Sequence, residues 1–361
     1  MNKSEIPLRR LLNQGLIQAD FKTPAEVAQW LGAVQAQDFL GAKWGVGLRL
    51  NSATEKQVDK AFTSGEILRT HLLRPTWHFV TAKDIRWILE LTRGRVHAVN
   101  AYMYRKLELD HAVFKRSETA LLKALQGCRQ LTRDELREVL QNAGINTEGE
   151  LRMGYLMMHA ELEGLICSAS RIGRQFSYAL LEERVPAAKS LTREEALTEL
   201  ARRYFDSRGP ATVQDFAKWS GLMVAEARLG LEPFKSRFQS EVRDRDVYWF
   251  PDTTPDGKLR SPKALLLSIY DEYISGYKDR RDIAGARVSE KLIAQGNALG
   301  HVIVIDGQIV GTWSRTFTAR AVTIETNSFR SLTKDEKRAV AAEGSRYGEF
   351  FGLPVMFGGT A

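Results

Sequence analysis

The sequence predicts an α+β fold with three tandem winged-helix units, followed by a small β-barrel-like C-terminal domain. Two observations predict this fold. An outline of helix, turn, helix and strand pair occurs three times before residue 257, and short apolar strands dominate from about residue 258. A chain of 361 residues is long enough for several such units with buried cores. We expect the units at residues 1–115, 116–188, 189–257 and 258–361.

The first unit is expected to combine short helices with two strands. Helical patterns cover residues 8–13, 24–31 and 56–62, and strand patterns cover residues 67–73 and 77–80. The strand segments alternate and are rich in Val, Phe and Trp, as suits a pleated sheet. This unit also contains the motif Gln35-Ala36-Gln37.

The second and third units begin with the same helix-start signal. Thr132 and Thr192 are each followed three residues later by Glu, a capping box. In the second unit we expect helices at residues 136–142 and 150–163 and strands at 165–168 and 176–180. In the third we expect helices at residues 192–206, 213–219 and 224–231 and strands at 238–242 and 247–250.

The last hundred residues change character. Strand patterns cover residues 264–269, 301–305, 309–313 and 321–326, and Asp306-Gly307 is a good hairpin turn between two of them. A third capping box at Thr333 predicts a terminal helix to residue 351. These features predict a β-rich domain with one terminal helix.

Composition narrows the class of protein. With 43% apolar and 27% charged residues, it is typical of a globular protein, and no apolar stretch is long enough to span a bilayer. The first ten residues lack the apolar core of a signal peptide, so we expect no export and a cytoplasmic, nucleoid-associated protein. Cys128 and Cys167 form neither a disulfide framework nor a zinc site, and we expect both to be buried.

The charge favours a polyanionic partner without proving one. The net charge is +8 with a pI near 9.4, and residues 1–120 contribute 18 Lys and Arg against 12 Asp and Glu, which is +6 of the +8. The positive excess therefore lies in the unit with the two glutamines. Double-stranded DNA, bound by a monomer, is the expected partner.

Several familiar catalytic motifs are absent from the sequence. It contains no P-loop, dinucleotide fingerprint, His-Glu-x-x-His or Gly-x-Ser-x-Gly motif, so we expect no nucleotide cofactor. Acidic and basic residues alternate too closely in Asp271-Glu272 and residues 276–281 for a metal site. We interpret that segment as a solvated, ion-paired loop, with Arg280 and Arg281 as possible phosphate contacts, and expect no metal.

Gln35 and Gln37 place two neutral amides in an otherwise apolar segment. Burying an amide without a partner costs a few kcal/mol, so the pair needs an explanation. One interpretation is structural, with the amides bracing a helix end through backbone hydrogen bonds. The other is chemical, with the amides positioning a reactant.

Residues 69–80 form a second dense segment of basic, aromatic and histidine residues. Arginines there could bind phosphates, Trp77 could stack on a base, and His78 could form a hydrogen bond. The alternative is a wing strand in which Trp77 belongs to the core and His78 is satisfied by the protein. Pro75 cannot donate to a ladder and indicates a bulge or strand start.

Together these segments resemble the AlkZ/YcaQ family of winged-helix DNA glycosylases. The resemblance rests on five segments in order along the chain, residues 34–38, 42–49, 69–80, 209–222 and 306–313. It implies tandem winged helices and a C-terminal β-barrel-like domain around duplex DNA. It also implies removal of alkylated purines, including the unhooking of interstrand crosslinks. Family members more often carry Arg-Gly-Thr-Leu-His where this chain has residues 74–78, so it resembles a divergent Gln-x-Gln branch.

The resemblance also assigns roles to residues. Gln35 and Gln37 match the catalytic Gln-x-Gln signature. The expected DNA-binding or lesion-binding residues, chosen by their neighbourhood, are Lys43, Trp44, Arg49, Arg69, His71, Arg74, Thr76, Trp77 and His78.

Neutral glutamines suit the chemistry of a cationic base. A purine alkylated on its imidazole ring is already a good leaving group and needs little acid catalysis, unlike a glycoside. Two amide oxygens could orient the attacking water. The alternatives are a non-catalytic winged-helix DNA-binding protein, such as a regulator or a lesion-binding protein, and a protein-interaction module with a basic surface.

Overall fold

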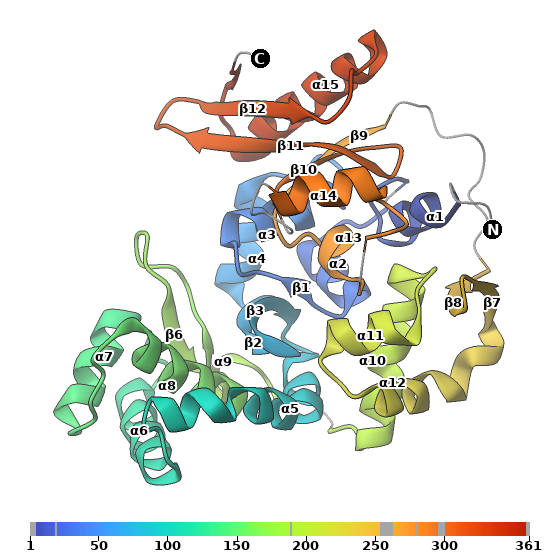
Figure 1. Ribbon diagram of the computed structural model, residues 1–361. Coiled ribbons are helices and arrows are strands. Elements are labelled where there is room, and N and C mark those ends of the chain that lie inside the picture. The colour runs from blue at the N-terminus through green and yellow to red at the C-terminus, as the bar shows by residue number, and fades with distance from the viewer. Residues whose placement is uncertain are drawn as a thin grey trace.

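The computed structural model describes residues 5–18, 20–187, 190–252, 263–278, 280–294 and 300–358. It confirms the α+β fold (Figure 1). The second unit, in green, and the third unit, in yellow, extend from opposite sides of the first unit, and the C-terminal sheet covers the first unit from above. The predicted boundaries at residues 188/189 and 257/258 fall outside the described residues, and the division into four units stays a prediction.

The first unit is built on a three-stranded antiparallel sheet in the order β1-β3-β2. Its elements are α1 (Glu5–Asn13), α2 (Pro24–Leu31), β1 (Val34–Gln35), α3 (Phe39–Leu48), α4 (Glu55–Ser64), β2 (Ile67–Leu72) and β3 (Arg74–Thr81). The predicted helices and strands are found here, but β1 and α3 were not expected. Helix α3 contains three glycines, which disfavour a helix in isolation. Tertiary packing requires one of them, because a Cβ at Gly47 would lie 2.4 Å from the ring of Phe350.

Two long helices not expected from the sequence lead into the second unit. They are α5 (Ile85–Lys106) and α6 (His111–Leu125). The unit then contains β4 (Leu131–Thr132), α7 (Arg133–Asn142), α8 (Glu150–Leu162), β5 (Ile166–Ser168), β6 (Ser177–Leu180) and α9 (Leu181–Arg184). The strands form an antiparallel sheet in the order β4-β6-β5, so the predicted helix pair and hairpin are confirmed.

The third unit follows the predicted element order. It contains α10 (Arg193–Arg208), α11 (Val213–Ser220), α12 (Val224–Leu231), the 3₁₀ helix η1 (Glu232–Arg237), β7 (Phe238–Arg243) and β8 (Asp246–Pro251). The helix starts are the predicted ones, since Thr192 forms a full capping box with Glu195.

The C-terminal domain is a five-stranded curled sheet in the order β13-β12-β11-β10-β9, a half-barrel with helix α15 beside it. Its elements are β9 (Ala264–Leu267), α13 (Glu272–Ser275), α14 (Ala286–Ala294), β10 (Val302–Ile305), β11 (Gln308–Phe317), β12 (Val322–Ser328), α15 (Lys334–Phe351) and β13 (Val355–Phe357). Asp306 and Gly307 both have positive φ, 48° and 83°, which confirms the predicted hairpin turn.

The first unit and the C-terminal domain share one hydrophobic core. Trp44 of α3 packs edge-on against Tyr347 and Phe350 of α15, with ring centroids 5.0 and 5.4 Å apart. Segments separated by three hundred residues therefore fold as one body, which places the α13 region directly behind β1.

Two smaller expectations can be compared with the structure. Cys167 is buried as expected, but Cys128 is exposed, because it lies in the turn after α6 rather than on an apolar face. Within the described part of the chain, no helix combines the length and apolar character needed to cross a bilayer.

His301, directly before β10 of the C-terminal sheet, should make the protein less stable in acid. Its Nδ1 accepts a hydrogen bond from the backbone N–H of Ile269 at 3.0 Å, and burial lowers the pKa of His301 to about 4. The unfolded chain binds a proton near pH 6.5, so the free energy of unfolding should fall as the pH decreases from about 6.5 to about 4. His301→Asn should reduce this decrease, measured by urea unfolding at pH 7.5 and 5.0. His111 is exposed, so His111→Asn should leave the pH-dependent decrease in the free energy of unfolding unchanged. The same decrease between pH 7.5 and 5.0 in wild type and both variants would contradict the prediction.

Candidate functional site

Strand pairing brings the two dense sequence segments together. β1 pairs with β3 so that Gln35 lies opposite His78, and the N–H of Ala36 donates to the carbonyl of Trp77 at 2.7 Å. The Gln-x-Gln motif thus begins on β1 and ends directly before Asp38, the N-cap of α3.

Gln35 is buried and bound at both its backbone and its side chain. Its N–H donates to Oε1 of Glu272 at 2.8 Å, and its side-chain oxygen accepts from a guanidinium nitrogen of Arg74 at 3.0 Å. Arg74 also donates to the carbonyl of Trp219 at 2.9 Å, and burial lowers the pKa of Arg74. Arg74, expected to contact phosphate, therefore orients the amide of Gln35.

Gln37 differs from Gln35 because it is exposed. Its Oε1 accepts one long hydrogen bond, 3.4 Å, from the N–H of Trp77. The next residue, Asp38, forms an ion pair with Arg315 of β11 at 2.7 Å. The backbone on both sides of Gln37 is thus attached to the fold, while its amide faces solvent.

A cavity of about 360 Å³ lies beside Trp77. Its lining residues are Arg69, Trp77, Arg133, Asp134, Arg174, Gln175, Phe176 and Tyr178. The guanidinium of Arg69 lies between two rings, 4.2 Å from that of Trp77 and 4.5 Å from that of Phe176. Its Nε donates to the carbonyl of Ala36 at 3.0 Å, and burial lowers the pKa of Arg69 to about 10. The cavity and the Gln-x-Gln motif are therefore linked through Trp77 and Arg69.

The two histidines of the segment lie inside the protein. His78 is fully buried, and its Nδ1 donates to the carbonyl of Thr76 at 2.9 Å. Burial and the nearby Arg74 lower the pKa of His78 well below its usual value. His71 is buried and its Nδ1 forms a hydrogen bond with the carboxylate of Glu161 of α8, with its ring against Trp77. His71 of β2 pairs with Trp77 of β3, and Thr70 pairs with His78, so the two histidines lie on opposite faces of the sheet. Thr76 is half-buried.

Three expected DNA-binding residues lie in the core instead. Lys43 is 1% exposed and pairs with Glu55 and Asp59, and Arg49 is fully buried against Asp271 at 2.9 and 3.0 Å. Trp44 is 1% exposed, and its N–H donates to the carbonyl of Leu266 at 2.7 Å. The expectation was wrong in its geometry, because the basic and aromatic run 43–49 forms a helix covered on all sides.

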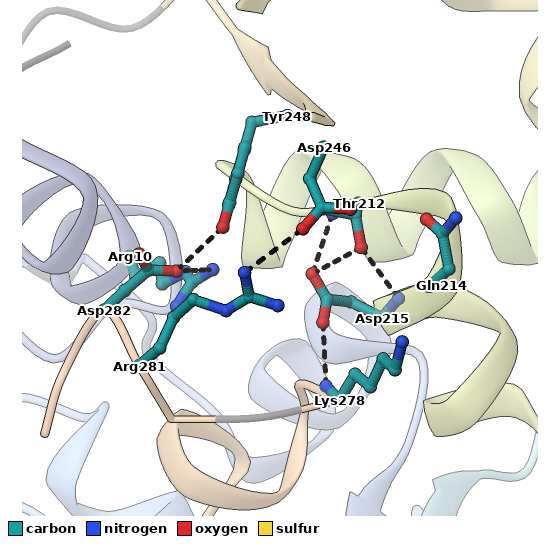
Figure 2. Close-up of a pocket in the computed structure, with 9 residues that line it drawn as sticks. All are labelled: Arg10, Thr212, Gln214, Asp215, Asp246, Tyr248, Lys278, Arg281 and Asp282. Carbon is teal, nitrogen blue, oxygen red and sulfur yellow. Dashed lines mark hydrogen bonds and ion pairs between the residues drawn. The ribbon is translucent and has the colours of Figure 1, made fainter. Parts of the chain in front are cut away.

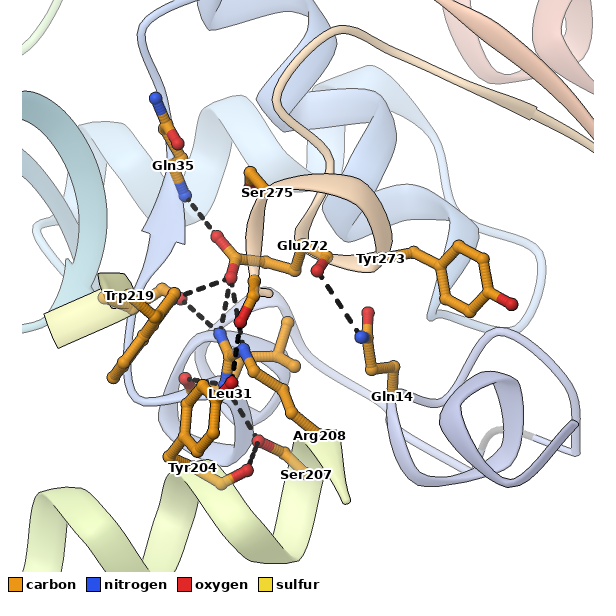
Figure 3. A network of polar contacts seen from close by, with 12 residues as sticks. Gln14, Leu31, Gln35, Tyr204, Ser207, Arg208, Trp219, Glu272, Tyr273 and Ser275 are labelled. Atoms are coloured by element: carbon orange, nitrogen blue, oxygen red, sulfur yellow. Dashed lines mark hydrogen bonds and ion pairs between the residues drawn. The ribbon is translucent and has the colours of Figure 1, made fainter. Parts of the chain in front are cut away.

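The loop expected to be solvated and ion-paired is ion-paired, but of its described residues only the basic end, Lys278 and Arg281, is exposed. Asp271 is 6% exposed and Glu272 is fully buried, since each pairs with a buried arginine, Arg49 and Arg208 respectively. The sequence did not predict that Glu272, Arg208 and Trp219 lie beside the Gln-x-Gln segment (Figure 3). Charge alternation suggested a surface loop, and no local pattern relates residue 35 to residue 272.

The charged pocket in Figure 2 is not a second site. It lies where α1 meets the third unit and has a volume of about 10 Å³. Arg10 pairs with Asp282 at 3.1 Å, and Arg281 pairs with Asp246 at 3.3 Å. Arg281, considered above as a phosphate contact, thus binds a carboxylate, and Asp279 of that loop lies outside the described residues.

One group of described side chains has metal-ligand chemistry. His97, His159 and Glu163 place their ligand atoms within 4.8 Å of one another. The Nε2 of His97 already bonds Glu163 at 2.8 Å, and Arg93 lies 3.4 Å from the same carboxylate. The group lies between α5 and α8, away from the glutamines. The contacts of Glu163 with His97 and Arg93 explain why these side chains lie together without a metal ion.

Comparison with known proteins gives a consistent picture. The family model described as "DNA glycosylase AlkZ-like" matches residues 28–350. An "Interstrand DNA cross-link repair glycosylase" from Streptomyces sahachiroi is 22% identical over 306 residues, which is 80% of this chain and 81% of that protein. The solved structure of the Streptomyces sahachiroi DNA glycosylase AlkZ has the same fold, with a TM-score of 0.78 and 20% identity over 99% of this chain and 100% of that one.

Proposed function

Because this chain belongs to the AlkZ-like family of DNA glycosylases, we propose that it hydrolyses the N-glycosidic bond of cationic alkylated purines in duplex DNA. The observation that supports this most directly is the contrast between the two glutamines. Gln35 is bound at its backbone and side chain, whereas the amide of Gln37 is exposed beside the half-buried Trp77. A fixed neighbour next to an accessible amide suits the positioning of a water molecule.

The proposed reaction needs no acid from the protein. The water oxygen forms a bond to C1′ as the bond from C1′ to the purine nitrogen breaks. The electron pair of the broken bond stays on the purine nitrogen and neutralises the cationic base. The proton of the water passes to solvent. Gln37 and Gln35 orient the water and stabilise the positive charge that develops on the sugar. An undamaged, uncharged base is a poorer leaving group, so the same site should leave it intact.

Trp77 and the aromatic cavity are the proposed lesion-binding surface. The half-buried rings of Trp77 and Phe176 can stack on a displaced or bulky base, and the cavity of about 360 Å³ has room for a substituent. The exposed Arg174, in the loop between β5 and β6, is the proposed phosphate contact. It takes the role first expected of Arg69 and Arg74, both of which bind protein groups. We propose that one chain acts alone at nucleoid DNA.

The test is base release from a duplex with one 7-methylguanine. After incubation, mild hot alkali should cleave the strand at the lesion, and an undamaged duplex should stay intact. Wild-type cleavage at the lesion would support the proposal. Salt-sensitive binding without cleavage would instead indicate a non-catalytic DNA-binding protein.

An interstrand crosslink should be tested as a second substrate. The Streptomyces relative is named for crosslink repair, and the open cavity offers space for the tethered second base. A duplex joined by a cationic N7–N7 guanine crosslink should be separated into single strands in a denaturing gel. Release of 7-methylguanine without unhooking would restrict the substrate class to monoadducts.

A further inference from the structure

We propose that Glu272 is a positioning residue that sets the place of the Gln-x-Gln segment. The inference rests on the proposed function and deepens it, because it identifies what fixes the reactive amides. Glu272 lies in α13 of the C-terminal domain, and its carboxylate is aimed at the backbone of β1 (Figure 3).

The carboxylate binds donors from three separate segments. Oε1 accepts from the N–H of Gln35 at 2.8 Å. Oε2 accepts from Nε1 of Trp219 at 2.9 Å and from the guanidinium of Arg208 at 2.6 and 3.2 Å. Glu272 is 0% exposed, so these bonds are shielded from bulk water.

Arg208 extends the same network to the residues just before Gln35. Its guanidinium donates to the carbonyl of Leu31 at 2.8 Å and to that of Ala33 at 3.2 Å. One buried ion pair thus binds the chain at residues 31, 33 and 35. The whole turn from α2 into β1 depends on it.

The position of β1 explains why such a contact is needed. β1 has only two residues and lies at the edge of its sheet, so only its inner side pairs with β3. The N–H of Gln35 points to the outer side, where no strand follows, and Glu272 supplies the missing acceptor.

Stability alone is a weak reason for this pair. Replacing a buried ion pair with apolar residues is often neutral or stabilising, whereas amides that orient water must be placed to within about 0.5 Å. A small shift of a reacting group can cost about 100-fold in rate. Loss of Glu272 should therefore slow base release more than it weakens DNA binding.

The test compares Glu272→Gln with Asp271→Asn. The first keeps the shape and one acceptor oxygen but leaves Arg208 unpaired. The second breaks the neighbouring Arg49–Asp271 pair, which is also buried but does not touch Gln35. We expect the single-turnover rate of 7-methylguanine release, per folded molecule, to fall about 10-fold to 100-fold in Glu272→Gln, with the half-saturating protein concentration within about threefold of wild type. Asp271 also caps α13, since its Oδ1 accepts from the N–H of Tyr273 at 2.9 Å, and Asn keeps an oxygen for that bond. Asp271→Asn should therefore keep the wild-type rate within about threefold.

A double variant tests whether Glu272 acts through Gln35. In a Gln35→Ala background, Glu272→Gln should cause little further loss of rate, because the group it positions is gone. The proposal would be overturned if the fold-losses in rate of the two single variants multiplied in the double variant. It would also be overturned if Glu272→Gln and Asp271→Asn lost the same fraction of the wild-type rate.

Amide exchange separates this inference from the proposed function. Hydrogen–deuterium exchange of a peptide covering residues 32–38 should be faster in Glu272→Gln than in wild type and unchanged in Asp271→Asn. If wild type released no base, the proposed function would fail while exchange still reported on the positioning contact. Unchanged exchange in Glu272→Gln would overturn the inference even in an active enzyme.

Discussion

Gln37→Ala should lower the single-turnover rate of 7-methylguanine release by about 100-fold or more while duplex binding changes little. Gln37 is exposed and makes one long side-chain hydrogen bond, so its removal should cost the fold almost nothing. Its contribution should therefore appear in the rate constant. The measurement is alkali-induced cleavage at saturating protein, with thermal unfolding as the check on folding.

Gln35→Ala should behave differently from Gln37→Ala. It removes the acceptor for the half-buried Arg74, whose guanidinium would be left with fewer partners, so both the rate and the melting temperature should fall. If Gln37→Ala kept the wild-type rate, the glutamine mechanism would be wrong. If both variants lost rate and stability together, the motif would be structural.

Trp44→Ala should be the most destabilising single change outside the site, by about 3–5 kcal/mol in the free energy of unfolding. The side chain is 1% exposed, lies against the rings of Tyr347 and Phe350, and donates to the carbonyl of Leu266. It therefore joins α3 to α15 and β9. Urea unfolding followed by circular dichroism measures the loss.

Trp77→Ala is the matched control for Trp44→Ala. Trp77 is half-buried and lines the cavity, so its loss should weaken binding of alkylated duplex more than it lowers stability. Trp44→Phe should recover most of the stability, because a ring still fills the space. If Trp44→Ala were stable but bound alkylated duplex weakly, Trp44 would be a lesion-binding residue and not a core residue.

Local sequence signals predicted much of the fold. Capping boxes at Thr132, Thr192 and Thr333 marked helix starts that the structure contains, and Asp306-Gly307 marked a real hairpin. These signals work because a cap or a tight turn is satisfied within a few residues. Helix α3 had no such signal, since its glycines disfavour a helix and only the surrounding core stabilises it.

The site was predicted in part for the same reason. Gln35, Gln37 and Trp77 were singled out from residue type and spacing, and strand pairing places them together, while their roles stay a prediction. Lys43 and Arg49 were wrongly expected to contact DNA, because the local sequence does not show whether a basic residue is exposed or buried against a carboxylate. Asp271, the partner of Arg49, lies 222 residues away.

The sequence by itself determined the order of helices and strands, the positive charge of the first third and the identity of the glutamine motif. These depend on local periodicity, capping and composition. Only the tertiary structure decided which glutamine is fixed and which is exposed, and it did so through Glu272, Arg208 and Arg74. Such contacts join residues far apart in the chain, and burial in a shared core, not local preference, determines which charges meet.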